Sequence, residues 1–190
     1  LNKKSDADSI KEFDPDVLVL AVGSKFTKPD IKGIDNDNLK TASEVLQDDS
    51  DIGKKVIIIG GGLVGLETAE YLIEKGKQIT ILEVTEHVAP TMPFITKIPL
   101  LLNLEKKGAK ILTEVRVARV TAEGVEIEHE GLTKLITGES IILATGGQPD
   151  NELEKELKNI VPIVHSAGSC HFPGDILTAV HDGFKIGQQI

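Results

Sequence analysis

The sequence predicts an α/β fold in which helices flank a parallel sheet and an antiparallel three-stranded meander follows. Three observations predict this class. A glycine-rich turn separates a short apolar strand from an amphipathic helix within residues 55–76. A second apolar strand then ends on an acidic residue, Glu83. From residue 115 the period of the apolar residues changes to two, which is typical of antiparallel strands with one buried face.

The glycine-rich turn follows a β-branched run, Val56 to Ile59, that suits a strand buried on both faces of a parallel sheet. Gly60, Gly62 and Gly65 then make the spacing G-x-G-x-x-G. This spacing permits a tight turn, lets a diphosphate approach the backbone, and lets the next helix pack closely on the strand. The turn therefore predicts a Rossmann-like unit that binds a dinucleotide.

The helix after this turn is predicted from about Leu63 to Lys75, and Gly76 ends it. Its first residues, Leu63 and Val64, offer free backbone N–H groups and a partial positive charge to the diphosphate. Glu67 is expected in the first turn, where any acid stabilises the helix dipole by about 0.3–1 kcal/mol. The alternative is that its carboxylate has a role in the site.

Glu83 stands eighteen residues beyond Gly65, at the end of the predicted strand Gln78 to Leu82. This unit usually places there the carboxylate that accepts hydrogen bonds from the adenosine ribose. The carboxylate would repel a 2′-phosphate, and residues 84–90 contain no Arg or Lys to bind one. We therefore expect NAD(H) rather than NADP(H), and His87 is the one nearby residue that could soften this preference.

Before the glycine-rich turn, the sequence predicts one strand and one short helix. Residues 9–13 are either a helical turn or a strand edge. Residues 16–22 show a buried-strand pattern. Thr41 and Ser43 are both suitable caps for a helix that ends near Gln47.

Beyond the two parallel strands, Thr96 is expected to cap a helix that runs to Lys107, and Gly108 ends it. Pro99 is compatible with this helix only if it falls in the first turn. Residues 110–113 form a third parallel strand. Three antiparallel strands follow, with turns at Glu123-Gly124 and Glu130-Gly131, and residues 140–144 return to a buried strand.

The C-terminal part is predicted to contain a helix at residues 151–159, a strand at residues 161–165 and a last helix at residues 176–190. Asp175 is a suitable cap for the last helix. Gly183 and Gly187 lie inside it, and each costs roughly 1 kcal/mol relative to Ala. We therefore expect close packing at both glycines.

Composition argues against several classes of partner. No apolar run approaches the roughly 20 residues that a membrane span requires, so no membrane partner is expected. A net charge of −9, a pI of about 5.1 and few aromatic residues argue against nucleic acid. The single cysteine, Cys170, rules out an internal disulfide and a Cys-x-x-Cys site within the chain, and reducing cytoplasm is the expected location.

The remaining reactive side chains form no recognisable site. The five histidines share no metal-ligand spacing and no Ser or Cys partner pattern, so no metal ligand and no catalytic residue is assigned. Each histidine is expected to be exposed or hydrogen-bonded. Cys170 is expected to be a small buried residue rather than a reactive thiol.

Several stretches resemble, in order, the second half of FAD-dependent pyridine nucleotide–disulfide oxidoreductases. They are VIIIGGGLVGLETAEYL, the meander, ILATGGQPDNEL and the closing AGSC…ILTAVHDGFKIGQQI. In particular, the chain resembles the C-terminal part of the NADH:flavin oxidoreductase group, which includes enoate reductase, 2,4-dienoyl-CoA reductase and trimethylamine dehydrogenase-like flavoproteins. The resemblance implies an enzyme that uses NAD and FAD, in which hydride passes from NADH to the flavin.

The resemblance also implies a domain organisation. Residues 52–145 would be a complete NAD-binding domain, inserted between two pieces of an FAD domain, residues 1–51 and 146–190. The charged linker at residues 48–53 marks the first boundary. Within the NAD domain, the family places Glu67 near the nicotinamide and Val117 beside the adenine, although a valine in a strand is also common in a core.

Five further residues are expected at FAD on the same resemblance. Gly146 and Gly147 lie where the chain crosses between the domains. Gly168-Ser169 matches a Gly-Asp pair whose Asp holds the ribityl chain of the flavin. The region of Ala179 resembles the start of a helix that faces the flavin ring.

The chain also departs from the family pattern. Ser169 replaces the Asp, so one charge-assisted contact to FAD is weakened or lost. The family's first G-x-G-x-x-G, which cradles the FAD diphosphate, is absent, as are the barrel domain that carries FMN and the cysteines for an iron–sulfur cluster. We therefore expect a fragment of a longer flavoprotein, with the FMN and iron–sulfur barrel domain as its partner.

Three functions remain open from the sequence. The first is an NADH-dependent flavin oxidoreductase, represented by its NAD domain and part of its FAD domain. The second is a non-catalytic module that binds an adenine nucleotide such as ADP. The third is an interaction or structural domain whose glycines serve only packing.

Overall fold

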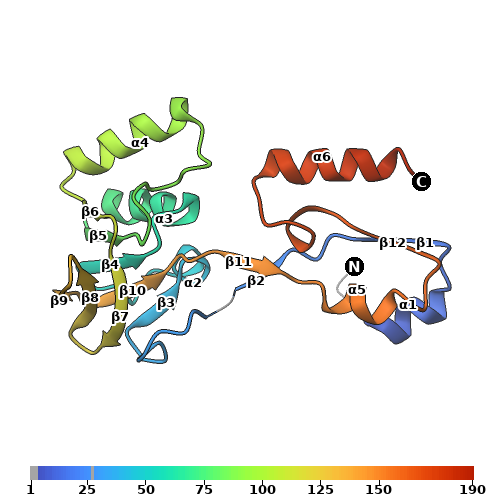
Figure 1. The fold of residues 1–190 in the computed structure, drawn as a ribbon, viewed down its shortest axis with the longest axis horizontal. Helices are drawn as coiled ribbons and strands as arrows, with labels where there is room; N and C mark the ends of the chain where they lie inside the picture. Colours follow the sequence, from blue (N-terminus) through green and yellow to red (C-terminus); the bar gives the residue numbers. More distant parts are fainter. Residues whose placement is uncertain (1–3, 27) are drawn as a thin grey trace. The chain divides into compact units, whose positions relative to one another are not determined.

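The computed structural model describes residues 4–26 and 28–190 of the chain, and Figure 1 shows its helices and strands. The described chain divides into two compact units. Residues 28–146 form the larger unit, and the residues before 28 together with residues 147–190 form the smaller one. The chain therefore passes from one unit to the other twice.

The larger unit is built on a five-stranded parallel sheet with the strand order β3-β10-β4-β5-β6. The strands are β3 (Leu39–Thr41), β4 (Lys55–Ile59), β5 (Gln78–Leu82), β6 (Lys110–Leu112) and β10 (Ser140–Leu143). In register, Ile59 at the end of β4 pairs with Leu82 of β5 and Leu143 of β10. The carboxyl ends of these three strands therefore meet at one edge of the sheet, directly before the glycine-rich turn.

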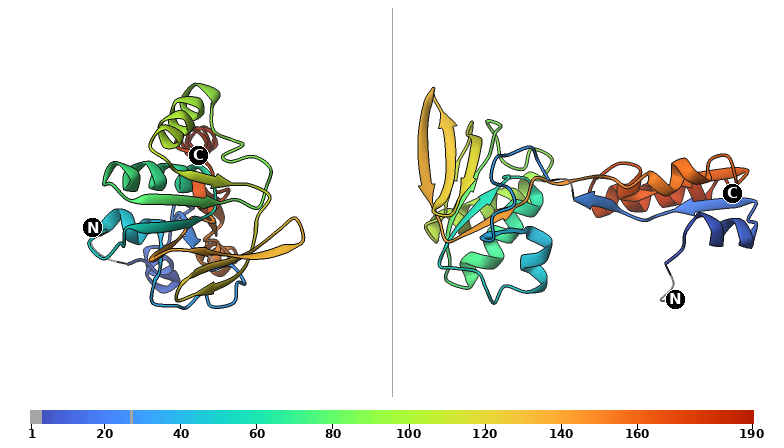
Figure 2. Two further views of the ribbon diagram at one scale, coloured as in Figure 1. Left: turned by 90° about the vertical axis from the view of Figure 1, so that its left-hand side faces the viewer. Right: turned by 90° about the horizontal axis from the view of Figure 1, so that it is seen from below.

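Helices cover one face of this sheet and the meander covers the other (Figures 1 and 2). The helices are α2 (Ala42–Gln47), α3 (Leu63–Glu74) and α4 (Phe94–Lys106). The meander strands are β7 (Arg116–Thr121), β8 (Gly124–His129) and β9 (Leu132–Thr137). Successive side chains of a strand point to opposite faces, so Val56 and Ile58 of β4 join the core under the helices. Ile57 and Ile59 join the core under the meander.

The predicted elements of this unit are mostly confirmed, including the parallel sheet, the meander and the helix after the glycine-rich turn. Of the two cap candidates for α2, the structure selects Thr41, whose hydroxyl accepts a hydrogen bond from the Glu44 N–H. The turn between β8 and β9 has positive φ angles at Glu130 and Gly131, +50° and +74°. Two consecutive positive φ angles are typical of a tight hairpin turn.

Two predictions in the larger unit differ from the structure. The boundary predicted after residue 51 lies well inside this unit, because β3 pairs with β10 and α2 packs into the helical core. The helix that Thr96 was predicted to cap begins at Phe94, with Pro93 as its N-cap. Pro99 is therefore the sixth residue of α4, beyond the first turn, so its expected position was wrong.

The smaller unit contains two strand pairs and short helices. The parallel pair is β1 (Val17–Leu20) with β12 (Ile163–Ser166), and the antiparallel pair is β2 (Ser24–Phe26) with β11 (Gly147–Pro149). The helices are α1 (Ala7–Phe13), α5 (Glu152–Leu157), the 3₁₀ turn η1 (Gly168–Cys170) and α6 (Ile176–Gly187). Residues 9–13, for which helix and strand edge were both open, are helical.

The last helix corrects one expectation. Asp175 caps α6 as predicted, since its side chain accepts a hydrogen bond from the Thr178 N–H at 2.8 Å. Close packing at Gly183 and Gly187 is not found, because a Cβ added at either position would meet no heavy atom within 4 Å. Within the described residues, every helix is too short or too polar to span a membrane.

Candidate functional site

The glycine-rich turn leaves the carboxyl end of β4, in the middle of the parallel sheet. Gly60 has a φ of +109°, which favours glycine, and a Cβ there would lie 2.5 Å from the Ala144 carbonyl oxygen. A Cβ on Gly65 would lie 1.9 Å from the Gly60 carbonyl oxygen. These two glycines therefore allow β4, α3 and the end of β10 to approach one another closely.

Gly62, the second glycine of the motif, differs from the other two. A Cβ there would meet no heavy atom within 4 Å, so the backbone at Gly62 borders open space. Gly62 is also the N-cap of the twelve-residue helix α3, and it provides no side-chain cap. The first N–H groups of a helix have no partner within the helix. This turn thus offers uncapped donors beside an open backbone, as a bound diphosphate requires.

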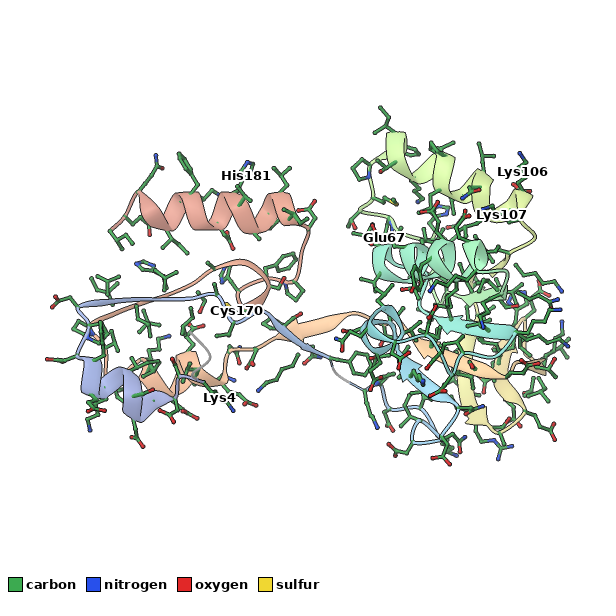
Figure 3. All side chains as sticks on the ribbon, turned by 180° about the vertical axis from the view of Figure 1, so that it is seen from behind. Lys4, Glu67, Lys106, Lys107, Cys170 and His181 are labelled. Carbon is green, nitrogen blue, oxygen red and sulfur yellow. The ribbon has the colours of Figure 1, made fainter. Side chains whose placement is uncertain are left out.

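Leu63 and Val64 open α3, and their side chains are 36% and 45% exposed. Glu67 is also exposed, but it is the fifth residue of the helix, and the first turn contains no acidic residue. The predicted position in the first turn was therefore wrong: α3 begins at Leu63 as predicted, and Glu67 lies one residue beyond the first turn. The helix dipole acts mainly within the first turn, so it accounts poorly for an acid at this position. Figure 3 labels Glu67 on α3.

The Glu83 side chain reaches back to the glycine-rich turn. Its Oε2 accepts a hydrogen bond from the Gly61 N–H at 2.7 Å. Its Oε1 accepts two more, from the Thr85 N–H and the Thr85 hydroxyl, each at 2.9 Å. Partial burial favours the neutral acid, but the hydrogen bonds from Thr85 and Gly61 outweigh it and lower the pKa of Glu83 below its usual 4.5. The carboxylate is therefore ionised at neutral pH.

Val117 lies on β7 in the segment that runs beside Glu83. The Val115 N–H donates to the Glu83 carbonyl oxygen at 2.9 Å, and Val117 follows two residues later. Val117 is half-buried and packs against the core under the meander. Its place beside an adenine stays a prediction.

The structure places the residues predicted at FAD in separate parts. Gly146 ends the larger unit with a φ of +85°, and Gly147 begins β11 of the smaller unit. Gly168 packs against α6, since a Cβ there would lie 3.3 Å from the Ala179 Cβ. Ser169 follows Gly168 in η1 and is half-buried. Gly168 and Ala179 are thus neighbours within the smaller unit.

Sequence reasoning missed three residues of the candidate site: Gly61, Thr85 and Val88. Gly61 donates to Glu83, and a Cβ there would lie 2.7 Å from Val88 Cγ1 and 3.2 Å from Glu83 Oε2. Thr85 holds the other carboxylate oxygen. Two signals in the sequence could have found them. Thr85 is a hydroxyl residue two positions after the acid, and Gly61 is one of three consecutive glycines.

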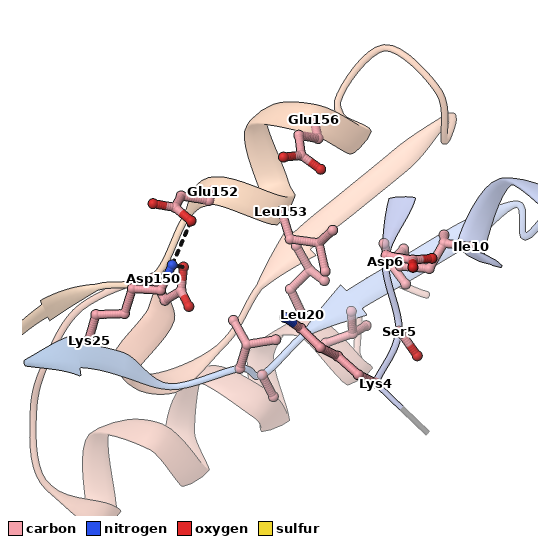
Figure 4. A pocket seen from close by; sticks show the side chains of 14 residues that line it. Lys4, Ser5, Asp6, Ile10, Leu20, Lys25, Asp150, Glu152, Leu153 and Glu156 are labelled. Carbon is pink, nitrogen blue, oxygen red and sulfur yellow. Dashed lines mark hydrogen bonds and ion pairs between the residues drawn. The ribbon is translucent and has the colours of Figure 1, made fainter. Parts of the chain in front are cut away.

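Other reactive groups stand apart from this turn. Cys170 is 2% exposed, as expected for a small buried residue, and its thiol donates to backbone carbonyl oxygens. Among the described residues, no group of three or more His, Cys, Asp or Glu side chains could hold a metal ion. A cavity of about 720 Å³ lies within the smaller unit, where Lys25 forms ion pairs with Asp150 and Glu152 (Figure 4).

Comparison with known proteins identifies relatives over nearly the whole chain. Residues 1–162 match the model of the family described as pyridine nucleotide-disulphide oxidoreductase. An NADH oxidase of Thermoanaerobacter brockii is 35% identical over 98% of this chain and 30% of its own length. A cinnamate reductase of Clostridium sporogenes is 29% identical over 100% of this chain and 29% of its own length.

A solved structure shows the same fold. A 2-naphthoyl-CoA reductase in complex with 2-naphthoyl-CoA superimposes with a TM-score of 0.92 at 35% identity. The match covers 100% of this chain and 29% of the reductase chain. The chain thus spans about 30% of the length of the curated relatives that it matches. Those relatives are longer proteins, and this chain corresponds to one part of them.

Proposed function

This chain belongs to the pyridine nucleotide-disulphide oxidoreductase family, whose members use FAD and NAD(H), and on that premise we propose a specific role for it. Residues 28–146 bind NADH, within a longer flavoprotein that passes hydride from NADH to FAD. The observation that carries the proposal is the 2.7 Å hydrogen bond between the Gly61 N–H and Glu83 Oε2, which brings the acid to the phosphate-binding turn. A dinucleotide needs both groups at one sheet edge.

Each group of this site has a distinct role in the proposal. The backbone at Gly62, Leu63 and Val64 holds the diphosphate, because the donors there are uncapped and the space is open. The Glu83 carboxylate accepts a hydrogen bond from a hydroxyl of the adenosine ribose. Val117 lies beside the adenine, and Glu67 lies toward the nicotinamide. NADH supplies the hydride when bound, and these residues only bind and orient it.

The fit to FAD is incomplete in this chain. The smaller unit supplies Gly147, Gly168, Ser169 and Ala179, but the sequence has no second G-x-G-x-x-G to hold a second diphosphate. Residues of the smaller unit are therefore proposed as pieces of an FAD domain that the rest of the parent protein completes. The same parent would contribute a barrel domain with FMN and an iron–sulfur cluster, and we propose a cytoplasmic location for it.

The names of two relatives support a proposal for the substrate class of the parent. Cinnamate reductase and 2-naphthoyl-CoA reductase are both named for the reduction of unsaturated or aromatic compounds. We propose that the parent of this chain passes its electrons to a substrate of that unsaturated kind.

A second candidate is a module that binds only ADP. Ser169 favours it, because the loss of the acid weakens one contact to the flavin that would receive the hydride. Calorimetric titration of the full chain with NADH, NADPH and ADP tests both candidates. Tighter binding of NADH than of the other two supports the oxidoreductase role. If ADP binds and neither NADH nor NADPH does, the second candidate is supported. If none of the three nucleotides binds, both candidates are contradicted.

A further inference from the structure

Both oxygens of the Glu83 carboxylate are already engaged, and they are engaged unequally. Oε1 accepts two hydrogen bonds, both from Thr85, whereas Oε2 accepts one, from the Gly61 N–H. A carboxylate has about four acceptor positions, two on each oxygen. Oε1 is therefore saturated by Thr85, and Oε2 keeps one acceptor position.

The Thr85 hydroxyl has one proton and two acceptors within reach. It lies 2.9 Å from Glu83 Oε1 and 2.9 Å from the His87 carbonyl oxygen. A hydrogen bond to an ionised acceptor is roughly twice as strong as one between neutral groups. The proton is therefore donated to the carboxylate, which ties the Glu83 side chain to the loop that follows β5.

The opposite side of the carboxylate is confined as well. Gly61 is close enough to donate to Oε2 only because it lacks a Cβ, which would lie 3.1 Å from Glu83 Cβ. Val88, a buried residue, closes the same space. Glu83 is thus held between Gly61 and Thr85, and its one remaining acceptor position belongs to Oε2.

We propose that Thr85 is a positioning residue for cofactor choice: it saturates Oε1 and fixes Glu83 so that Oε2 receives a ribose 2′-hydroxyl and opposes a 2′-phosphate. This inference rests on the proposed NADH site. Arg116 and Arg119 do not offset the charge of Glu83, because each is paired with a glutamate of β8, Glu128 and Glu126. The preference for NADH over NADPH therefore depends on where the carboxylate is held.

The test compares two substitutions of Thr85 in the full chain. Thr85→Val keeps the β-branched shape but removes the hydroxyl, whereas Thr85→Ser keeps the hydroxyl. Thr96→Val is the matched control, because Thr96 is also exposed and its hydroxyl also donates one hydrogen bond, but to the Pro93 carbonyl oxygen and not to Glu83. NADH and NADPH affinities are measured by calorimetry for all four proteins.

We expect Thr85→Val to reduce the NADH-to-NADPH affinity ratio about fivefold, the factor that corresponds to one hydrogen bond of ordinary strength. Thr85→Ser and Thr96→Val should change it less than about twofold, which lies within the effect of a surface substitution. An unchanged ratio in Thr85→Val overturns the inference while the proposed function stands. Failure of the unsubstituted chain to bind either nucleotide contradicts the proposed function instead.

A second measurement needs no nucleotide. The carboxyl carbon of Glu83 reports its protonation in an NMR titration of the free chain. Loss of the Thr85 hydroxyl should raise the pKa of Glu83 in Thr85→Val and leave it unchanged in Thr85→Ser. Equal pKa values in the two variants would show that the hydroxyl does not hold the carboxylate, and the inference would be overturned even if no nucleotide binds.

Discussion

The Glu83 carboxylate accepts a hydrogen bond from the Gly61 N–H at 2.7 Å, so the acid at the end of β5 is joined to the glycine-rich turn at the end of β4. The two strands are parallel, with Ile59 opposite Leu82. Strand β4 ends directly before the glycine-rich turn, and β5 ends directly before Glu83. The fold thereby brings together a site for a diphosphate and an acceptor for a ribose.

Removal of the acid should reduce the preference for NADH over NADPH. In Glu83→Ala, loss of the ribose contact should weaken NADH binding about tenfold, the effect of one hydrogen bond to a charged group. NADPH binding should improve relative to NADH, because the carboxylate no longer opposes the 2′-phosphate. Affinities measured by calorimetry check this, with Glu86→Ala, an exposed neighbour, as the control. If NADPH binds Glu83→Ala as much more weakly than NADH as it binds the unsubstituted chain, the cofactor assignment is contradicted.

Gly62→Ala should fold normally but lose nucleotide affinity. Gly62 has a φ of −72°, which any residue adopts, and open space where the new Cβ would stand. The added methyl group should therefore leave the melting temperature nearly unchanged while it obstructs the diphosphate. A melting curve and a titration with ADP measure the two effects. Full ADP affinity in a folded Gly62→Ala protein would place the diphosphate elsewhere.

Gly65→Ala should show the opposite result. Its Cβ would lie 1.9 Å from the Gly60 carbonyl oxygen, a backbone atom, so the backbone itself would have to shift. We expect a loss of about 1–3 kcal/mol in the free energy of unfolding, which is typical of overpacking. Urea denaturation measures it. Stability equal to that of the unsubstituted chain would show that α3 packs less closely on the turn than the structure indicates.

Glu83 should also contribute to stability in a way that depends on pH. Its pKa is lowered in the folded state from its usual 4.5, so its contribution is present above pH 4.5 and is lost as the pH falls through the folded value. Glu83→Gln should therefore be less stable than the unsubstituted chain at neutral pH, by about 1 kcal/mol for the disturbed hydrogen bonds. Urea denaturation from pH 7 to pH 3 should show this difference shrinking below pH 4.5, and a difference independent of pH would refute it.

The order of the elements around the glycine-rich turn followed from the sequence, because its signals are local. The spacing of Gly60, Gly62 and Gly65 and the β-branched run before it fix a strand, a turn and a helix within twenty residues. The strand Gln78–Leu82 was predicted with the same ends that the structure has. Short-range patterns of this kind report directly on backbone conformation.

The unit boundary and the role of Gly61 depend on contacts between distant segments, which local sequence patterns do not report. The unit boundary lies near residue 28 rather than 51 because β3 pairs with β10, a strand about a hundred residues later. The role of Gly61 appears only when β4 and β5 lie side by side, whereas Thr85 contacts Glu83 locally, two residues along the same loop. Pro99 was misplaced because the first residue of its helix was predicted too late, whereas Glu67 was misplaced although α3 begins where predicted, because it is the fifth residue of that helix.

The most direct measurement of the central claim is an NMR titration of the isotopically labelled full chain with NADH. The account predicts that the largest shifts occur at the backbone amides of Gly61, Gly62, Leu63 and Val64 and at the carboxyl carbon of Glu83. If NADH saturates the chain while these signals stay unmoved and others shift, the NADH site at the glycine-rich turn is contradicted.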